Sequence, residues 1–298
     1  MGESEKMKTP IAILRLRKTI LRWFDANARD LPWRRTRDPW AVLVSEYMLQ
    51  QTQVERVIPK YLDFLRRWPT PAALAESSLA EVLATWSGLG YNRRAKNLHA
   101  AAIAICEQFG GVVPLDVDAL ISLPGIGRYT AAAVASFAGN ADVVLWDTNI
   151  RRIFMRVLHG GEFARRLPDD ATLETILSRV LPRGRSRDWH GALMDFGSAV
   201  CVSRAPACAA CPLAASCVAA PSFLAGKSPR VALIRPQSKF EGSRRQARGA
   251  IVRLLTEKGP LTETYVIAAT ACKDARAVIT DLERDGMLRR EGDLITLP

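Results

Sequence analysis

The sequence predicts an all-α protein followed by a small C-terminal module that ends in a β-ribbon. Apolar residues recur every three or four positions through much of residues 10–220, which is the period of an amphipathic helix. Proline and glycine residues punctuate this region at short intervals, as is typical of turns between helices. The alternation of apolar and polar residues that a half-buried sheet needs is missing there, so the region should be helical.

The helical period is clearest in five segments before residue 110. They are residues 11–24, 41–49, 54–64, 79–86 and 98–109. Residues 143–146 (Val-Val-Leu-Trp) are ambiguous, because a short strand and a buried turn before a helix fit them equally well. From residue 218 the period is lost and prolines and serines accumulate, which indicates a linker.

The C-terminal module should contain helices at residues 246–255 and 275–282 and a two-stranded ribbon at 288–297 with a Gly292-Asp293 turn. Helices followed by a ribbon within this length suggest a winged-helix-like module. The expected regions are a helical domain at 1–220 with a cysteine loop at 201–217, a linker at 221–242 and the module at 243–298.

The chain is strongly basic, with 42 Lys and Arg against 30 Asp and Glu and a net charge of +12. This balance favours a polyanionic partner, although a basic proteome background would produce it too. No apolar run approaches the roughly 18 residues that a membrane span needs. We therefore expect a soluble, cytoplasmic protein that binds no membrane and keeps its six cysteines reduced or on a metal.

Four of those cysteines gather in one short stretch, Cys201-x6-Cys208-x2-Cys211-x5-Cys217. Soft thiolates select iron–sulfur clusters or zinc. A structural zinc site usually pairs two short Cys-x2-4-Cys knuckles, and here only Cys208 and Cys211 have that spacing. The longer gaps favour a [4Fe–4S] cluster as the cofactor, with zinc as the alternative.

A second motif is the run from Leu123 to Ala131, Leu-Pro-Gly-Ile-Gly-Arg-Tyr-Thr-Ala. Gly125 and Gly127 allow a tight turn with bare backbone, and a helix that begins near Tyr129 presents free N–H groups. Together with Arg128, these groups could hold a phosphate without reading sequence. A Gly-x-Gly alone is more often an ordinary turn.

Two carboxylates are candidates for acid and anion chemistry. Glu46 lies within the mostly apolar residues 42–49, where burial would raise its pKa and suit it to general acid work. The commoner role of such a residue is an exposed glutamate on an amphipathic helix. Asp147 precedes a helix, which fits an N-cap and also an anion that stabilises positive charge on a sugar.

Taken together, these motifs make residues 10–220 similar to an adenine DNA glycosylase of the MutY type, within the endonuclease III superfamily. The segments that carry the resemblance are Leu31–Arg34, Asp38–Trp40, Ser45–Gln53, Gly88–Tyr91, Leu123–Ala131, Asp147–Asn149 and the four cysteines. Met48–Thr52 is the most specific of them to adenine glycosylases. The resemblance implies a two-lobed helix-hairpin-helix fold with a [4Fe–4S] loop.

By this resemblance the enzyme hydrolyses the N-glycosidic bond of an adenine mispaired with 8-oxoguanine or guanine, after flipping the base from the duplex. Glu46 would protonate the base at N7 and later activate water, and Asp147 would stabilise the oxocarbenium-like sugar. Tyr129 and Asn149 would support Asp147. Superfamily members with strong strand cleavage carry a lysine where this chain has Tyr129, so we expect a monofunctional enzyme.

The resemblance also implies a set of DNA contacts. Gln50 would wedge into the base stack with Gln51 beside it, Tyr91 would intercalate near the lesion, and Arg204 would hold the backbone from the cysteine loop. The expected partner is double-stranded DNA with a mispaired or oxidised base. The enzyme should act as a monomer in the bacterial cytoplasm, associated with the nucleoid.

Two features depart from the family pattern. Thr148 stands where glycine is commoner between the aspartate and the asparagine, which should preserve both functional side chains. Residues from 243 onward do not resemble the Nudix-like domain that reads 8-oxoguanine in the family. The second helix expected there is rich in acids, with Asp281, Glu283 and Asp285 among them, so a docking or stabilising role is favoured, and the sequence names no protein partner.

Two other functions stay open. A mismatch thymine or uracil glycosylase of the same superfamily shares the fold, the cluster and the tyrosine. The Gln50-Gln51 pair argues against that alternative, and the missing lesion-reading domain argues for it. A non-catalytic, redox-sensing DNA-binding regulator is a third possibility, but it would have no need of Glu46 and Asp147.

Overall fold

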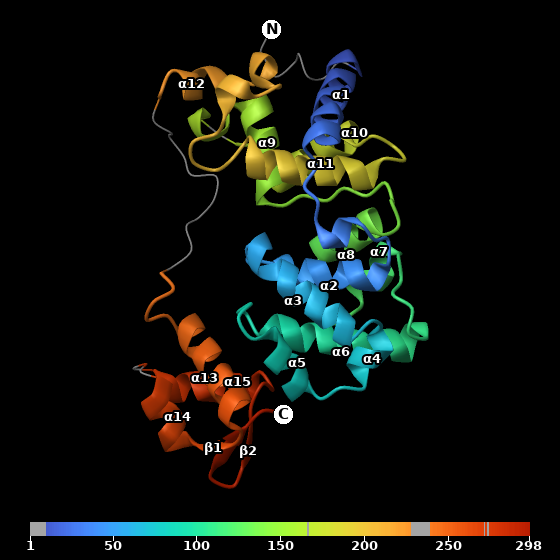
Figure 1. Ribbon diagram of the computed structural model, residues 1–298. Helices are drawn as coiled ribbons and strands as arrows, with labels where there is room; N and C mark the ends of the chain where they lie inside the picture. Colours follow the sequence, from blue (N-terminus) through green and yellow to red (C-terminus); the bar gives the residue numbers. More distant parts are fainter. Residues whose placement is uncertain (1–9, 166, 228–238, 271, 273) are drawn as a thin grey trace. The chain divides into compact units, whose positions relative to one another are not determined.

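The computed structural model describes residues 10–165, 167–227, 239–270, 272 and 274–298, which are mostly helical (Figure 1). The described residues form two compact units. Unit 1 takes its residues from Met1–Leu31 and Ala132–Pro236, and unit 2 takes its residues from Pro32–Ala131 and Gln237–Pro298. The chain therefore leaves unit 1 before the first proposed acid, Glu46, and returns to it before the second, Asp147.

Unit 2 begins with a bundle of helices. Its elements are η2 (Pro32–Arg34), α2 (Pro39–Leu49), α3 (Val54–Arg67), α4 (Pro71–Ala75), α5 (Leu79–Trp86), α6 (Arg93–Phe109), α7 (Val117–Ile121) and the start of α8 (Arg128–Phe137). Local signals set the helix ends: the Asp38 side chain caps α2 ahead of Pro39, and Ser78 and Glu81 form a capping box on α5. Helix α6 packs against α2, α4 and α5.

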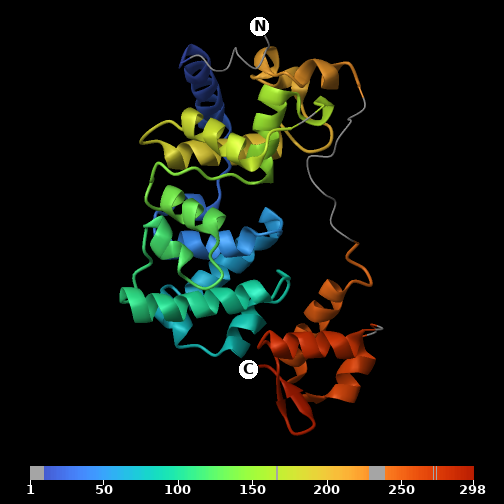
Figure 2. The same ribbon diagram turned by 180° about the vertical axis from the view of Figure 1, so that it is seen from behind.

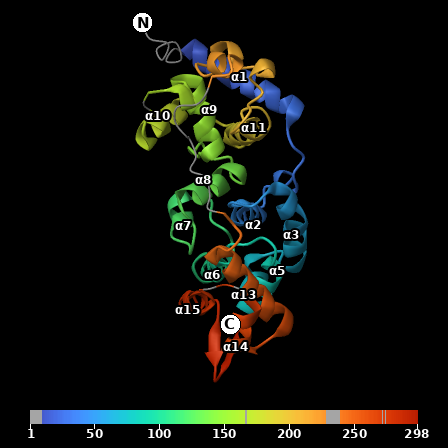
Figure 3. The ribbon, with the colours of Figure 1, turned by 90° about the vertical axis from the view of Figure 1, so that its left-hand side faces the viewer.

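The C-terminal part of unit 2 is a three-helix module with a small sheet. It comprises α13 (Arg244–Lys258), β1 (Leu261–Thr262), α14 (Glu263–Thr270), α15 (Ala275–Arg284), β2 (Arg289–Glu291) and β3 (Leu294–Thr296). The sheet is antiparallel in the order β1-β3-β2, with Ile295 opposite both Leu261 and Arg290. Figure 2 shows the helices and strands of this module in orange and red. Helix α13 packs against α5 of the same unit (Figure 3).

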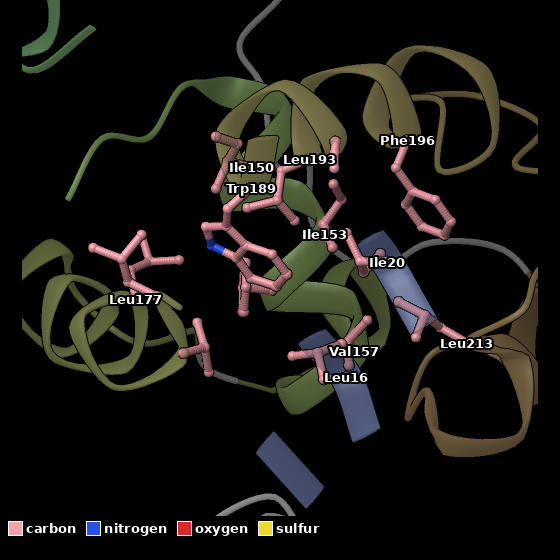
Figure 4. Packing of buried hydrophobic residues seen from close by; sticks show 14 of the residues in the cluster. Leu16, Ile20, Ile150, Ile153, Val157, Leu177, Trp189, Leu193, Phe196 and Leu213 are labelled. Atoms are coloured by element: carbon pink, nitrogen blue, oxygen red, sulfur yellow. The ribbon is translucent and has the colours of Figure 1, made fainter. Parts of the chain in front are cut away.

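Unit 1 contains α1 (Pro10–Asn27), α9 (Thr148–His159), η3 (Gly161–Phe163), α10 (Asp170–Val180), α11 (Ser186–Ala199), η4 (Cys208–Ala210), η5 (Ala214–Ser216) and α12 (Ala220–Leu224). Its core gathers side chains from α1, α9, α10 and α11. Figure 4 shows Trp189 among Ile150, Ile153 and Leu193, with Leu213 of the cysteine loop at the same core. Burial of this apolar surface anchors both the helix after Asp147 and the loop of the cysteines.

The five helices expected before residue 110 are confirmed, as α1, α2, α3, α5 and α6. The helices and the ribbon of the C-terminal module are present too, whereas the sequence did not predict β1 and α14. Residues 143–146 form neither a strand nor a turn, and only Leu145 of them is buried. The expected linker at 221–242 overlaps α12 at its start, and residues 228–238 of it lie outside the described residues.

Candidate functional site

Glu46 lies on α2, in a helix that buries most of its length. Nine consecutive residues, from Trp40 to Met48, are buried, and Glu46 itself is 6% exposed. A carboxyl at such a place is costly to desolvate, and structural carboxylates are seldom this buried. The burial expected for a general acid is therefore present at Glu46.

The loop after α2 is held by one buried guanidinium, that of Arg94. The Arg94 side chain donates to the carbonyl oxygens of Tyr47, Met48 and Gln50, at 2.7–2.9 Å. Its other terminal nitrogen donates to Thr52 Oγ1 and to the carbonyl oxygens of residues 89 and 90, at 2.9–3.1 Å. Burial lowers the pKa of Arg94 to about 10, so the group stays charged at neutral pH. Arg94 thus fixes the loop that carries Gln50 to the loop that leads to Tyr91.

Gln51 and Tyr91 share an unusual backbone conformation. Gln51 has φ +55° and Tyr91 has φ +49°, and among the described non-glycine residues only Asn140 is like them. Side chains of this size rarely adopt positive φ, and such strain concentrates at functional sites. Gln51 is exposed, and Gln50 donates from Nε2 to Thr130 Oγ1 at 3.4 Å. The structure therefore places strain at two of the residues expected to contact DNA.

The Gly-x-Gly turn joins α7 to α8, as the hairpin motif predicts. Gly125 has φ +73°, and a Cβ there would lie 2.5 Å from the Cβ of Asn97, so both conformation and space require glycine. A Cβ at Gly127 would meet nothing within 4 Å. The Tyr47 hydroxyl donates to the Pro124 carbonyl at 2.8 Å and ties the turn to α2. Helix α8 begins at Arg128, which is exposed, and Tyr129 follows it, half-buried.

Asp147 caps α9 and is the centre of a hydrogen-bond network. Its carboxylate accepts from the backbone N–H groups of Asn149 and Ile150 and from Asn149 Nδ2, at 2.8–2.9 Å. Arg152, which is 3% exposed, donates to Asn149 Oδ1 at 2.8 Å and to the Gly197 carbonyl at 2.7 Å. A Cβ at Gly197 would lie 2.7 Å from the Cβ of Asn149. The N-cap role is therefore real, and it holds the carboxylate in one orientation.

The same arginine reaches the cysteine loop. Arg152 Nε donates to the Cys201 carbonyl at 2.7 Å, and Arg156 lies one turn further along α9 with Nη1 3.5 Å from Cys201 Sγ. Arg156 is buried and forms an ion pair with Glu162, besides donating to the Val202 carbonyl at 2.7 Å. Two buried cations thus connect the start of the loop to the helix that Asp147 caps.

The four loop cysteines share one neighbourhood. Cys201, Cys211 and Cys217 pack against the unit 1 core, and Cys208 begins the short helix η4 that leads to Cys211. Burial raises the pKa of Cys217 to about 11, and burial followed by the charge of Cys201 raises the pKa of Cys208. Within the described residues no three Cys, His, Asp or Glu side chains are close enough to hold a metal ion. The charge of Cys201 acts on the pKa of Cys208, Cys211 and Cys217, so the four thiols lie within electrostatic range of one another. Four soft thiol donors beside the Arg156 cation are the donor type that an iron–sulfur cluster takes.

The expected site residues are distributed over both units. Glu46, Gln50, Gln51, Tyr91, Gly125, Gly127, Arg128 and Tyr129 belong to unit 2, and Asp147, Asn149, Arg204 and the four cysteines belong to unit 1. Arg204 is exposed on the cysteine loop. The sequence did not point to Arg94 and Arg152, because a lone arginine on a helix carries no motif. Both nevertheless follow segments of the resemblance, since Arg94 comes after Gly88–Tyr91 and Arg152 comes after Asp147–Asn149.

Comparison with known proteins identifies relatives of this chain. Residues 44–182 match the model of the HhH-GPD superfamily of base excision DNA repair proteins. The chain is 39% identical over 278 residues to an adenine DNA glycosylase of Mycolicibacterium smegmatis, covering 92% of each protein. Only about 8% of this chain is left out, so the alignment extends into the C-terminal module.

Solved structures show the same fold. A thermostable thymine-DNA glycosylase matches with a TM-score of 0.66 and 29% identity, over 70% of this chain and 97% of the other. An endonuclease III in a non-covalent DNA complex matches with a TM-score of 0.63 and 23% identity, over 73% of this chain and 99% of the other. The chain therefore belongs to the HhH-GPD superfamily of base excision DNA repair glycosylases and, within it, to the adenine DNA glycosylase family.

Membership in this family makes the chain a DNA glycosylase of base excision repair. It confirms the resemblance and the helical fold expected from the sequence. The individual roles of the site residues, the cluster and the opposite base stay predictions. No helix among the described residues is both long and apolar enough to cross a membrane.

Proposed function

We propose that this protein removes adenine from a mispair with 8-oxoguanine or guanine in duplex DNA and leaves the strand intact. The observation that carries the proposal is Glu46, a carboxyl only 6% exposed, one turn before the glutamine loop that Arg94 fixes. A buried carboxyl on the helix that leads to a strained, exposed Gln51 would suit a pocket for a flipped base. The 39% identity to an adenine DNA glycosylase over most of both chains supports adenine as the base.

In the proposed reaction Glu46 is the proton donor. Its carboxylic acid protonates adenine at N7, and the electron pair of the bond between C1′ and N9 then leaves with the base. The sugar becomes oxocarbenium-like, and the Asp147 carboxylate stabilises that positive charge. Water adds to C1′ and gives its proton to the Glu46 carboxylate, which restores the acid and leaves an abasic site.

The residues around Asp147 are positioning residues in this mechanism. Three donors at 2.8–2.9 Å hold the carboxylate, and Arg152 fixes Asn149 from its other side. Tyr129 supports the same step and offers no amine for a Schiff base, so the enzyme should be monofunctional. Gln50, Gln51 and Tyr91 would contact the duplex near the lesion. Gly125, Gly127, Arg128 and Arg204 would hold its backbone.

Cys201, Cys208, Cys211 and Cys217 would hold a [4Fe–4S] cluster as the resident cofactor. When bound, the cluster would tie the loop into one rigid unit and present Arg204 to DNA. The buried Arg156 beside Cys201 would offset part of its negative charge. Zinc is the alternative, and the brown colour and iron content of the purified protein decide between them.

We further propose that residues 243–298 are a winged-helix-like module joined to the helical domain by the linker at 221–242. The acids of helix α15 and its C-cap are paired within the protein: Asp281 of α15 with Arg244 and Arg284, and the C-cap residue Asp285 with Arg93 and Arg248. These pairs favour the docking role expected for the acids. The enzyme would act as a monomer on chromosomal DNA in the bacterial cytoplasm.

The proposal is tested with duplexes that carry adenine, thymine or uracil opposite 8-oxoguanine or guanine. Base release is followed under single-turnover conditions, with and without alkali to reveal abasic sites. We expect adenine release, fastest opposite 8-oxoguanine, and strand breaks only after alkali. Release of thymine or uracil in its place would move the protein to the mismatch branch, and breaks without alkali would contradict a monofunctional enzyme.

A further inference from the structure

Unit 2 contains a large groove that the helical domain and the C-terminal module build together. Its volume is about 1210 Å³. One wall is formed by residues 51–53, Arg56 and residues 87–92, and the other is formed mainly by α13 with Phe240 and Asp274. Gln51 and Tyr91, the two strained residues of the site, line it, so the groove continues from the proposed DNA-contacting loops onto the module.

The groove is basic. Three arginines line it, Arg56, Arg245 and Arg253, against one acid, Asp274. Arg56 and Arg253 are exposed, and no acidic side chain of the described residues pairs with either of them. By contrast, the arginines of α13 that face the acidic helix, Arg244 and Arg248, are each paired with an aspartate. Arg253, on the groove side of α13, therefore adds a positive charge to the groove that no described acid pairs with.

The module is attached firmly beside this groove. The Asp285 carboxylate accepts from Arg93 of α6 at 2.8 Å and from Arg248 of α13 at 2.6 Å, which bridges the two parts of the unit. Arg245 donates to the Tyr91 hydroxyl at 2.7 Å, and its guanidinium lies 5.5 Å from the centre of that ring. The same guanidinium lies 5.4 Å from the Phe240 ring. Arg245 thus links the strained Tyr91 loop directly to α13.

We propose that this groove binds the phosphodiester backbone of duplex DNA, so that the C-terminal module extends the DNA-binding surface beside Tyr91. The ligand chemistry follows from the lining. Exposed guanidiniums bind phosphate oxygens, while the amides of Gln53 and Gln246 can donate to phosphate or sugar oxygens. The lining includes bare backbone at Gly90, where a Cβ would meet nothing within 4 Å, so a backbone strand can approach closely. This inference rests on the proposed function, since it assumes that the substrate is duplex DNA.

The test is the salt dependence of binding to an undamaged duplex, measured by fluorescence anisotropy with the full-length holoenzyme. We compare the wild type with Arg56→Ala, Arg253→Ala and the double variant. Each phosphate contact contributes about 0.9 to the slope of log K against log salt. Each single variant should therefore flatten the slope by about 0.9 and the double variant by about 1.8, with binding weakened roughly five- to tenfold per arginine at 0.1 M salt.

Arg284→Ala is the matched control. It removes one positive charge from the same module, but Arg284 does not line the groove and its partner Asp281 keeps Arg244. Its slope should stay at the wild-type value. Equal slopes for the wild type and all three groove variants would overturn the inference, as would a slope that falls equally in Arg284→Ala. Because binding is measured on undamaged DNA, a wild type that releases no adenine would refute the proposed function without altering this result.

Discussion

Loss of the Arg94 side chain should lower the free energy of unfolding and also disturb the loops that we expect to contact DNA. Its guanidinium donates to six acceptors, in the segment from Tyr47 to Thr52 and at residues 89 and 90. Three of these acceptors are fully buried carbonyls, those of Tyr47, Met48 and Leu89. An unsatisfied buried acceptor costs about 1–3 kcal/mol, and water entering the space left behind recovers part of it.

We therefore expect Arg94→Met to lower the free energy of unfolding by about 3–5 kcal/mol. Arg94→Lys keeps the charge but has three donors in place of a planar fork, so it should recover about half of that loss. The measurement is urea unfolding at pH 7 with single-turnover adenine release on the same samples. Both loops should lose their fixed geometry, so release should slow in Arg94→Met even where the protein is fully folded.

An Arg94→Met variant that unfolds within about 1 kcal/mol of the wild type would refute this reasoning. So would an Arg94→Lys variant that is no better than Arg94→Met in both assays, because the two differ in charge and donors while having similar length. Lys60→Met is a useful control, since Lys60 also donates to a backbone carbonyl, that of Thr85, but is not buried.

Four further outcomes follow from the structure. Burial lowers the pKa of His190 to about 4, so the unfolded chain binds a proton at a higher pH than the folded protein does. The free energy of unfolding should therefore fall by about 3 kcal/mol as pH drops from 6.5 to 4. Urea unfolding should show this pH dependence in the wild type and not in His190→Asn. Asp147→Asn keeps an N-cap residue, so its thermal midpoint should be unchanged while base release falls roughly 10²- to 10³-fold. Gly125→Ala should cost about 2 kcal/mol and weaken duplex binding, because its Cβ would strike Asn97 at a positive φ. Arg156→Met leaves a buried Glu162 uncompensated and should lose iron to a chelator faster than the wild type, whereas equal rates would contradict its role.

Much of the fold was predictable, because its information is local. The spacing of apolar residues in the sequence was enough to predict helices α1, α2, α3, α5 and α6. Asp38-Pro39 and Ser78 with Glu81 mark helix starts that are visible in the sequence. Strand β1 is two residues long and exists only through pairing with β3, so no local pattern could show it. The conformation of residues 143–146 could not be predicted either, because it depends on which residues cover Leu145.

The site was predictable where chemistry forces a residue type into a motif. Gly125 is required by a positive φ and by Asn97, and the spacing of the four cysteines marks them as candidate ligands of one metal centre. Arg94 and Arg152 were not predictable, because their partners are backbone carbonyls and amides that any sequence supplies. The groove beside Tyr91 could not be predicted for another reason, because it joins residues separated by about 150 positions. Their proximity is shown by the hydrogen bond from Arg245 to Tyr91 and by the pairing of Asp285 with Arg93 and Arg248.

The most direct test of the central claim is the single-turnover rate of adenine release opposite 8-oxoguanine in Glu46→Gln. Glu55→Gln serves as the control, because Glu55 is an exposed glutamate on the next helix. If Glu46 supplies the proton, Glu46→Gln should bind the duplex like the wild type and release adenine at least about 10²-fold more slowly, while Glu55→Gln keeps the wild-type rate. Release by Glu46→Gln at the rate of the wild type would contradict the account.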